Sequence, residues 1–297
     1  MPGSRQDYLE PALHGVRRYV LLDVFTDRAM SGNQLAVFPD ADGVAEAAMQ
    51  RVARELNLSE TVFLFPPRDG ESAYARIFTP AAELPFAGHP LLGAAVVLAR
   101  ALDTPQPVVR TAAGAFELLV GDRREPTPSA TLTHELAPPS PFAREEQLLA
   151  ALGIPAAAVD VDSVVNGAVH VLVALDDADA VARLTPDLGA LAALGPLAVS
   201  CFAGDGPIWR TRMFAPALGV AEDPATGSAA GPIAGRLCRT GQAAYGSWLE
   251  IRQGEEIGRP STIWARVDRG EGSDRASVRG SVVFIGEGHL AVGEDRV

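Results

Sequence analysis

Cysteine is scarce in this chain. Its 297 residues include only two, Cys201 and Cys238. Two cysteines cannot form the disulfide framework that stabilises small secreted domains, and their separation does not match the paired spacing of a structural zinc site. We therefore expect a protein that is held together by a hydrophobic core and works in a reducing cytoplasm.

Long apolar runs and runs of positive charge are missing as well. No apolar run approaches the roughly 20 residues that a membrane-spanning helix needs, and the first residues lack the apolar stretch of a signal peptide. The 25 basic and 37 acidic residues give a net charge of −12, with no basic cluster to attract a phosphate backbone. The sequence predicts neither a membrane nor a nucleic-acid partner.

Several common site signatures are also absent. There is no dinucleotide fingerprint and no phosphate-binding loop, and Ser228 takes the second position of Gly227–Gly231, not the central position of a nucleophile elbow. We expect a site without a metal or a nucleotide cofactor, because the five histidines lack paired metal-ligand spacing. They are His14, His89, His134, His170 and His289.

What the chain does contain is a repeat. Arg76–Pro80 returns as Arg212–Pro216, a displacement of 136 residues, and Glu83–His89 returns as Glu222–Ser228, a displacement of 139 residues. A three-residue insertion near Gly219–Ala221 accounts for the difference. So long a period predicts two related domains and not a solenoid of short repeats.

The length also suits two domains, each large enough for a core of its own. We place an N-terminal domain at 1–125, completed by 286–297, and a C-terminal domain at 126–285. Residues 1–16 are predicted to be a polar extension. The polar, proline-rich stretch 121–129 is either a hairpin tip or the junction between the domains.

Each copy of the repeat leads from an apolar strand through a turn into a helix of small residues, at 90–99 and 229–237. Neither helix is amphipathic, which predicts that each is enclosed by a curved sheet. Gly88 and Gly227 let a ligand approach the unpaired N–H groups at the helix starts. Both starts are candidate anion sites, and they could hold a small acid between them if the domains face each other.

The rest of the chain alternates strands with a few helices. An amphipathic pattern predicts a helix at 45–56, and an Ala/Leu run predicts another at 188–194. Apolar runs predict strands at 19–25, 35–38, 61–65, 111–120, 161–165, 169–175, 249–252, 262–267 and 282–285.

Glu60 is the first candidate for chemistry. It lies where the helix at 45–56 gives way to a buried strand, with Ser59 beside it, so its carboxylate could point into a cleft. Partial loss of hydration would raise its pKa and make it a better proton acceptor near neutrality. The alternative is an ordinary solvated loop glutamate.

His89 and Ser228 occupy matching places at the two helix starts. The imidazole of His89 could relay a proton or bind an acid, or it could merely satisfy backbone groups. Ser228 could be an N-cap with no further role, although a cap and an anion contact can coexist.

Asp223 stands where the first copy has Leu84. A carboxylate in place of a leucine suggests that the second copy acquired a task of its own. Two carboxyl groups on opposite walls can have their pKa values pushed apart, which would give one acid and one base. The alternative is an ordinary Asp-Pro turn.

Taken together, these motifs closely resemble the PhzF family of phenazine-biosynthesis proteins, within the diaminopimelate-epimerase-like superfamily. The matching stretches are DVFTDRAMSGNQLAVF (23–38), ARELNLSETVF (53–63), RIFTPAAELPFAGHPLLG (76–93), CFAGDG (201–206), RMFAPALGVAEDPATGSAAGP (212–232) and QGEEIGRPS (253–261).

The resemblance implies an α+β fold of two similar domains, each a curled, mainly antiparallel sheet or barrel around a central helix, and usually a homodimer. It implies no metal or organic cofactor. Glu60 would be the general acid/base, with His89 and Asp223 as further catalytic residues. The expected substrate-binding residues are Asn33, Ser59, Gly88, Gly227 and Ser228.

Two departures bear on the chemistry. Diaminopimelate epimerases place a cysteine at each helix start, whereas this chain has Gly88-His89 and Gly227-Ser228, which excludes epimerisation by two thiols. The family's Gly-Asn-Pro is Gly-Asn-Gln here, so Gln34 replaces a proline beside the expected substrate site.

The reaction implied by the phenazine branch of the family is isomerisation of trans-2,3-dihydro-3-hydroxyanthranilate. Glu60 would move a proton from the ring carbon that bears the hydroxyl to the carbon that bears the carboxylate, giving an enol that becomes a reactive aminoketone. Two alternatives stay open. One is an isomerase or cyclase of the same fold acting on another small cyclic amino acid, and the other is a non-catalytic binder of small acids.

Overall fold

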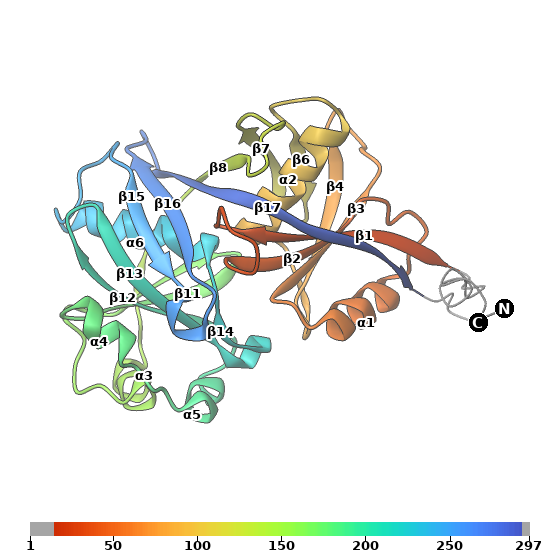
Figure 1. Ribbon diagram of the computed structural model, residues 1–297. Coiled ribbons are helices and arrows are strands. Elements are labelled where there is room, and N and C mark those ends of the chain that lie inside the picture. The colour runs from red at the N-terminus through yellow and green to blue at the C-terminus, as the bar shows by residue number, and fades with distance from the viewer. Residues whose placement is uncertain (1–14, 293–297) are drawn as a thin grey trace.

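The computed structural model describes residues 15–292. Figure 1 shows two lobes side by side, the first built from the red-to-yellow part of the chain and the second from the green-to-blue part. One long strand, β17 (Arg275–Ala291), runs across both lobes. The predicted extension 1–16 lies outside the described residues except at its end, where β1 begins at Val16.

The first lobe is a sheet curled around α2 (Gly88–Ala101). From β1 to β7 the hydrogen-bonded strand order is β1, β2, β3, β4, β6, β7. The short strand β5 also pairs with β4, on the edge opposite β3. The strands are β1 (Val16–Val24), β2 (Asn33–Phe38), β3 (Glu60–Phe65), β4 (Ala73–Phe78), β5 (Glu83–Leu84), β6 (Val108–Thr111) and β7 (Gly114–Val120).

The second lobe repeats this plan around α6 (Gly227–Arg239). Its strands pair in the corresponding order, and every pairing has the same direction as its counterpart in the first lobe: parallel for β11 with β12 and for β13 with β15, antiparallel elsewhere. The strands are β10 (Asp162–Asn166), β11 (Ala168–Ala174), β12 (Leu197–Asp205), β13 (Ile208–Ala215), β14 (Val220–Asp223), β15 (Leu249–Gln253) and β16 (Ser261–Asp268).

The repeat in the sequence is therefore a repeat in space. Arg76 forms an ion pair with Glu83 across β4 and β5, and Arg212 forms the matching pair with Glu222 across β13 and β14. The three additional residues of the second copy fall where a short 3₁₀ helix, η2 (Pro216–Leu218), precedes β14. The expected fold of two similar lobes, each with a curled sheet around a helix, is confirmed.

Both central helices are enclosed, as their lack of amphipathic pattern predicted. Every residue of α2 from Gly88 to Val96 is buried, and in α6 every residue from Ala229 to Cys238 is buried. The largest hydrophobic cluster includes Leu91 and Leu92 of α2 together with Ile233 and Leu237 of α6. The two lobes thus share one continuous core.

The stretch 121–129 is the tip of a hairpin between β7 and β8 (Ser129–Glu135), in which Gly121 N–H donates to the Ser129 carbonyl at 2.8 Å. β8 also pairs with residues 275–281 of β17. Residues 282–291 of β17 pair with β1, so β17 closes the ladder of the first lobe. The division at 125/126 stays a prediction.

The remaining helices lie outside the sheets. The predicted helix at 45–56 is confirmed as α1 (Glu46–Leu56), which packs Met49, Val52 and Ala53 against the first sheet. Three helices cover the second sheet, and the 188–194 prediction is confirmed as the last of them: α3 (Glu145–Leu152), α4 (Ala178–Ala182) and α5 (Leu188–Ala193). The small elements are β9 (Ser140–Pro141) and η3 (Glu255–Ile257).

Candidate active site

A cavity lies between the two lobes and is lined by both copies of the repeat. Its empty volume is about 530 Å³, a value that includes the opening to solvent. Glu60, Gly88 and His89 reach it from the first lobe, and Gly227 and Ser228 reach it from the second. The two helix starts therefore share one cavity, as the repeat predicted.

The starts of α2 and α6 touch each other at the two glycines. A Cβ atom on Gly88 would lie 3.0 Å from the backbone nitrogen of Ser228, and a Cβ on Gly227 would lie 2.8 Å from Cζ of Phe25. Only glycine permits this approach. Neither helix has a side-chain cap, at Ala87 or at Thr226, so the first N–H groups stay available to an anion.

Ser228 is not the N-cap of α6. The cap position belongs to Thr226, and Ser228 lies within the first turn of the helix and lines the cavity. Its carbonyl accepts a hydrogen bond of 2.7 Å from the Asn166 amide. The capping interpretation of Ser228 is thus wrong, whereas its contact with substrate stays a prediction.

Glu60 is the first residue of β3, and its side chain turns inward instead of toward solvent. The side chain is 15% exposed, and its Oε2 atom is buried without a hydrogen-bond partner. Burial, and secondly the negative charge of Asp223, raise the pKa of Glu60 well above its usual value. The solvated-loop alternative does not hold, because Glu60 belongs to a strand and its carboxyl group points into the cavity.

His89 faces Glu60 across the cavity. Its Nε2 lies 3.5 Å from Oε2 of Glu60, and the imidazole is 3% exposed. Burial lowers the pKa of His89 to about 3, against a smaller opposing effect from the Gln34 carbonyl. The ring is therefore neutral near pH 7, and the contact with Glu60 is a close approach of two groups and not an ion pair.

Asp223 is held by three donors. Asn33 Nδ2 and Ser59 Oγ donate to its Oδ1 at 2.8 and 2.9 Å, and Thr226 Oγ1 donates to its Oδ2 at 2.6 Å. Burial raises the pKa of Asp223 to about 6, although these three hydrogen bonds oppose the shift. The carboxylate is fixed by both lobes, since Asn33 and Ser59 belong to the first.

All of the predicted site residues are thus brought together. Asn33 and Ser59 reach the cavity through Asp223, and whether they also touch substrate stays a prediction. Within residues 15–292 no group of three or more histidine, cysteine or acidic side chains could hold a metal ion. No helix in that part of the chain is both long enough and apolar enough to cross a membrane.

Two supporting residues escaped the sequence reasoning. Gln253 Nε2 donates to the Asp223 carbonyl at 2.7 Å and to Thr226 Oγ1 at 2.9 Å, while its Oε1 accepts from the Thr226 N–H at 3.1 Å. Gln253 therefore orients the hydroxyl that binds the Asp223 carboxylate. The only signal was that Gln253 and Thr226 lie inside the stretches that carry the family resemblance.

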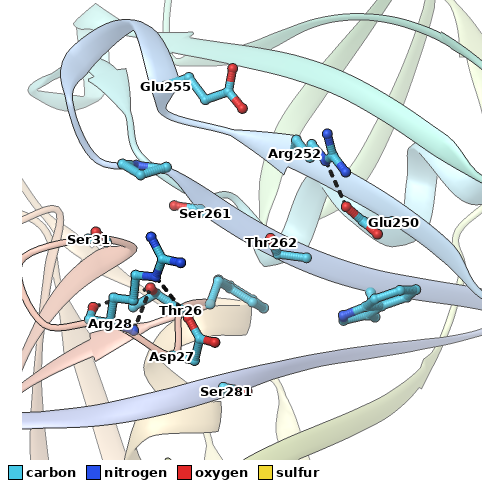
Figure 2. A pocket seen from close by; sticks show the side chains of 13 residues that line it. Thr26, Asp27, Arg28, Ser31, Glu250, Arg252, Glu255, Ser261, Thr262 and Ser281 are labelled. Atoms are coloured by element: carbon cyan, nitrogen blue, oxygen red, sulfur yellow. Dashed lines mark hydrogen bonds and ion pairs between the residues drawn. The ribbon is translucent and has the colours of Figure 1, made fainter.

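A larger hollow opens elsewhere on the surface, between the loop after β1 and strands β15 and β16. It contains about 1000 Å³ of space open to solvent. Figure 2 shows two ion pairs among its charged side chains: Arg252 Nε donates to Glu250 at 2.7 Å, and Arg28 Nε lies 3.9 Å from Asp27 Oδ1. Glu255 pairs instead with Arg210, at 2.9 Å. None of the predicted site residues lines it, so size alone does not identify the site.

Comparison with known proteins decides the family. The model of phenazine biosynthesis-like proteins, PhzC-PhzF, matches residues 22–288. The chain belongs to this family. The resemblance found in the sequence is confirmed, and it extends over nearly the whole of the described structure.

Curated relatives of this PhzC-PhzF protein carry one activity in their names. A trans-2,3-dihydro-3-hydroxyanthranilate isomerase of Pseudomonas fluorescens is 43% identical over 278 residues, which are 93% of this chain and all of the relative. The protein of the same name from Pseudomonas aeruginosa is 43% identical over 274 residues, 92% of this chain and 99% of that one.

Solved structures agree with the PhzC-PhzF assignment. A predicted epimerase of Pseudomonas aeruginosa superposes with a TM-score of 0.80 at 35% identity, covering 92% of this chain and 99% of the other. A hydroxyproline epimerase of Agrobacterium vitis, 14% identical, shares the fold with a TM-score of 0.64 over 95% and 94% of the two chains. The expected epimerase-like fold is confirmed.

Proposed function

We propose that this protein is a cofactor-independent isomerase that moves a proton within trans-2,3-dihydro-3-hydroxyanthranilate, in phenazine or related secondary-metabolite biosynthesis. One structural observation carries the proposal. The Oε2 atom of Glu60 is buried without a hydrogen-bond partner and lies in a cavity that two uncapped helix starts also enter. The curated relatives named for this reaction support the choice of substrate.

In the proposed mechanism the substrate carboxylate binds the N–H groups at the starts of α2 and α6. The ionised form of Glu60 takes the proton from the ring carbon that bears the hydroxyl and returns it to the carbon that bears the carboxylate. The enol product then becomes a ketone. The substrate is neither oxidised nor reduced, and Glu60 returns the same proton that it removed. This transfer therefore needs no second acid or base. Its raised pKa brings its basicity closer to that needed at neutral pH.

The neighbours of Glu60 keep this transfer inside the cavity. His89 is neutral, so it can hydrogen-bond the substrate without holding Glu60 in an ion pair. Asp223, fixed by its three donors, attracts the amino group of the substrate. Holding the ring at near-attack distance supplies much of the rate, and the enclosed site limits proton loss to water.

The assembly and location proposed for the protein follow the family expectation of a homodimer in the cytoplasm. Both cysteines, Cys201 and Cys238, are buried and unpaired, which suits a reducing compartment. Sedimentation at micromolar concentration tests the dimer, and a single monomer boundary would contradict it.

The test of the proposed function is direct. The purified protein is mixed with trans-2,3-dihydro-3-hydroxyanthranilate, and the loss of the diene absorbance is followed. The expected result is turnover without added metal or cofactor. In D₂O the product should keep part of the transferred hydrogen as protium, because one enclosed base moves it. A substrate that stays unchanged while anthranilate still binds would instead favour a binder of small acids or an enzyme for another cyclic amino acid.

A further inference from the structure

One side chain of the cavity is unexplained by the proposed mechanism. His170, on β11, lines the cavity with 1% of its surface exposed, and neither ring nitrogen has a hydrogen-bond partner. Buried polar atoms in folded proteins are nearly always paired, because an unpaired one has lost its hydrogen bonds to water without replacement. A histidine with both nitrogens unpaired beside a ligand cavity therefore suggests that the ligand completes its hydrogen bonds.

The wall around His170 is otherwise apolar. Among the described residues that β11, β12 and β13 contribute to the cavity, His170 is the polar one. The others are Ala168, Ala198, Met213 and Ala215. A polar substituent of the ligand that faces this wall thus meets a single imidazole.

The internal repeat relates this wall to the part of the first lobe that carries Glu60. Thr61 pairs with Phe78 in the first lobe as Val199 pairs with Phe214 in the second, so Ala198 stands at the position that Glu60 holds in the first lobe. His170 is the ladder partner of Ala198. The second lobe thus has alanine at the position of Glu60 and carries an imidazole on the adjacent strand.

The substrate chemistry then assigns a partner by elimination. The carboxylate of the proposed substrate fits the helix starts, and its amino group fits the carboxylate of Asp223. The remaining polar substituent is the ring hydroxyl. We infer that His170 binds this hydroxyl and thereby sets the specificity of the site for hydroxylated cyclic amino acids. The inference rests on the proposed function.

The electrostatics of the site agree with this role. Burial lowers the pKa of His170 to about 4; the Asn166 carbonyl opposes the shift, but it does not reach hydrogen-bond geometry with either nitrogen. The imidazole is therefore neutral near pH 7 and presents one N–H donor and one acceptor nitrogen. A hydroxyl group can accept from the first or donate to the second.

The experiment compares two stable aromatic ligands, 3-hydroxyanthranilate and anthranilate, which differ only in the hydroxyl. Binding of each is measured by calorimetry to the wild type and to His170→Leu and His170→Gln. The wild type should bind the hydroxylated ligand roughly tenfold more tightly. His170→Leu should abolish this preference, and His170→Gln, which keeps a donor and an acceptor, should retain part of it. His170→Met replaces the leucine variant if that protein does not fold.

Ser200→Ala is the matched control. Ser200 is fully buried on β12 with an unpartnered hydroxyl, but it does not line the cavity. Its substitution should leave the ligand preference unchanged. A preference that survives in His170→Leu, with turnover of the proposed substrate intact in the wild type, would overturn the role of His170 alone. A wild type that neither binds the two ligands nor turns over substrate would overturn the proposed function as well.

Discussion

Asp223 of β14 and Leu84 of β5 occupy the same ladder position in the two lobes. Met213 pairs with Asp223 as Ile77 pairs with Leu84. Both residues line the cavity, so the pocket is nearly symmetric in its backbone and asymmetric in its chemistry. Each lobe supplies one carboxyl group that its counterpart lacks, because Glu60 in turn corresponds to Ala198.

The first prediction concerns Glu60 as the base. Glu60→Gln preserves size and removes the ionisable group, so turnover of trans-2,3-dihydro-3-hydroxyanthranilate should fall by about 10²–10⁴-fold. Affinity for anthranilate should change little. Initial rates and calorimetry measure the two effects. Glu55→Gln, on the exposed face of α1, is the control and should keep the wild-type rate. An unchanged rate in Glu60→Gln would remove this residue from the mechanism.

Glu60→Gln should also raise the thermal stability of the protein, by an amount that depends on pH. The pKa of Glu60 is raised in the folded protein, so its contribution to stability is complete below the unfolded value and is lost as the pH rises through the folded value. Glu60→Gln should therefore raise the Tm at pH 8 and much less at pH 4. A gain of about 1 kcal/mol corresponds to roughly 2 °C for a chain of this size. Equal changes at both pH values, measured by scanning calorimetry, would contradict this.

Asp223 should control the acid limb of the pH–rate profile. Its negative charge is one cause of the raised pKa of Glu60, so Asp223→Asn should lower that pKa. The rise of kcat/KM with pH should then begin at a lower pH than in the wild type. The amide oxygen can still accept from Asn33 and Ser59, which limits rearrangement. Asp205→Asn, at an exposed position, is the control. A limb that stays in place or moves to higher pH would argue against this coupling.

Gly88 should tolerate no side chain. A methyl group there would press on the backbone of Gly227 and Ser228, so Gly88→Ala should destabilise the protein by about 1–3 kcal/mol and weaken anion binding. Gly272→Ala is the control at an exposed bend, where a Cβ would meet no atom within 4 Å, so alanine should be neutral or stabilising by up to about 1 kcal/mol. Urea titration and anthranilate binding test both variants. Equal stability of the two would show that the helix starts can move apart freely.

Much of this architecture could be predicted because the repeat constrained it. The repeated pattern around Arg76 and Arg212 implied two segments with the same local structure. In the structure each arginine forms the matching ion pair, Arg76 with Glu83 and Arg212 with Glu222. The lack of a polar face in both central helices was enough to predict their burial. The inward orientation of Glu60 was predicted from its place between a helix and a buried strand. At the first residue of such a strand, a polar side chain can point toward the interior.

What could not be predicted depended on contacts between distant segments. Gln253 supports Asp223 from across 30 positions of sequence, and nothing local distinguishes it from a surface glutamine. His170 lies in an apolar strand, where a lone histidine has no partner that spacing would reveal. For β17 only residues 282–285 were predicted, because glycines interrupt the alternation of apolar and polar residues along it. Its pairing with β1, β8 and β16 keeps the whole segment extended.

The path of β17 has a consequence for folding. The sheet of the first lobe is completed only by residues 282–291, which are synthesised after the strands of the second lobe. The first lobe must therefore wait, with an unpaired edge, until β17 has been synthesised. We expect the two halves to gain and lose structure in a single cooperative transition, and a chain shortened before residue 282 to aggregate before it accumulates as a folded first half.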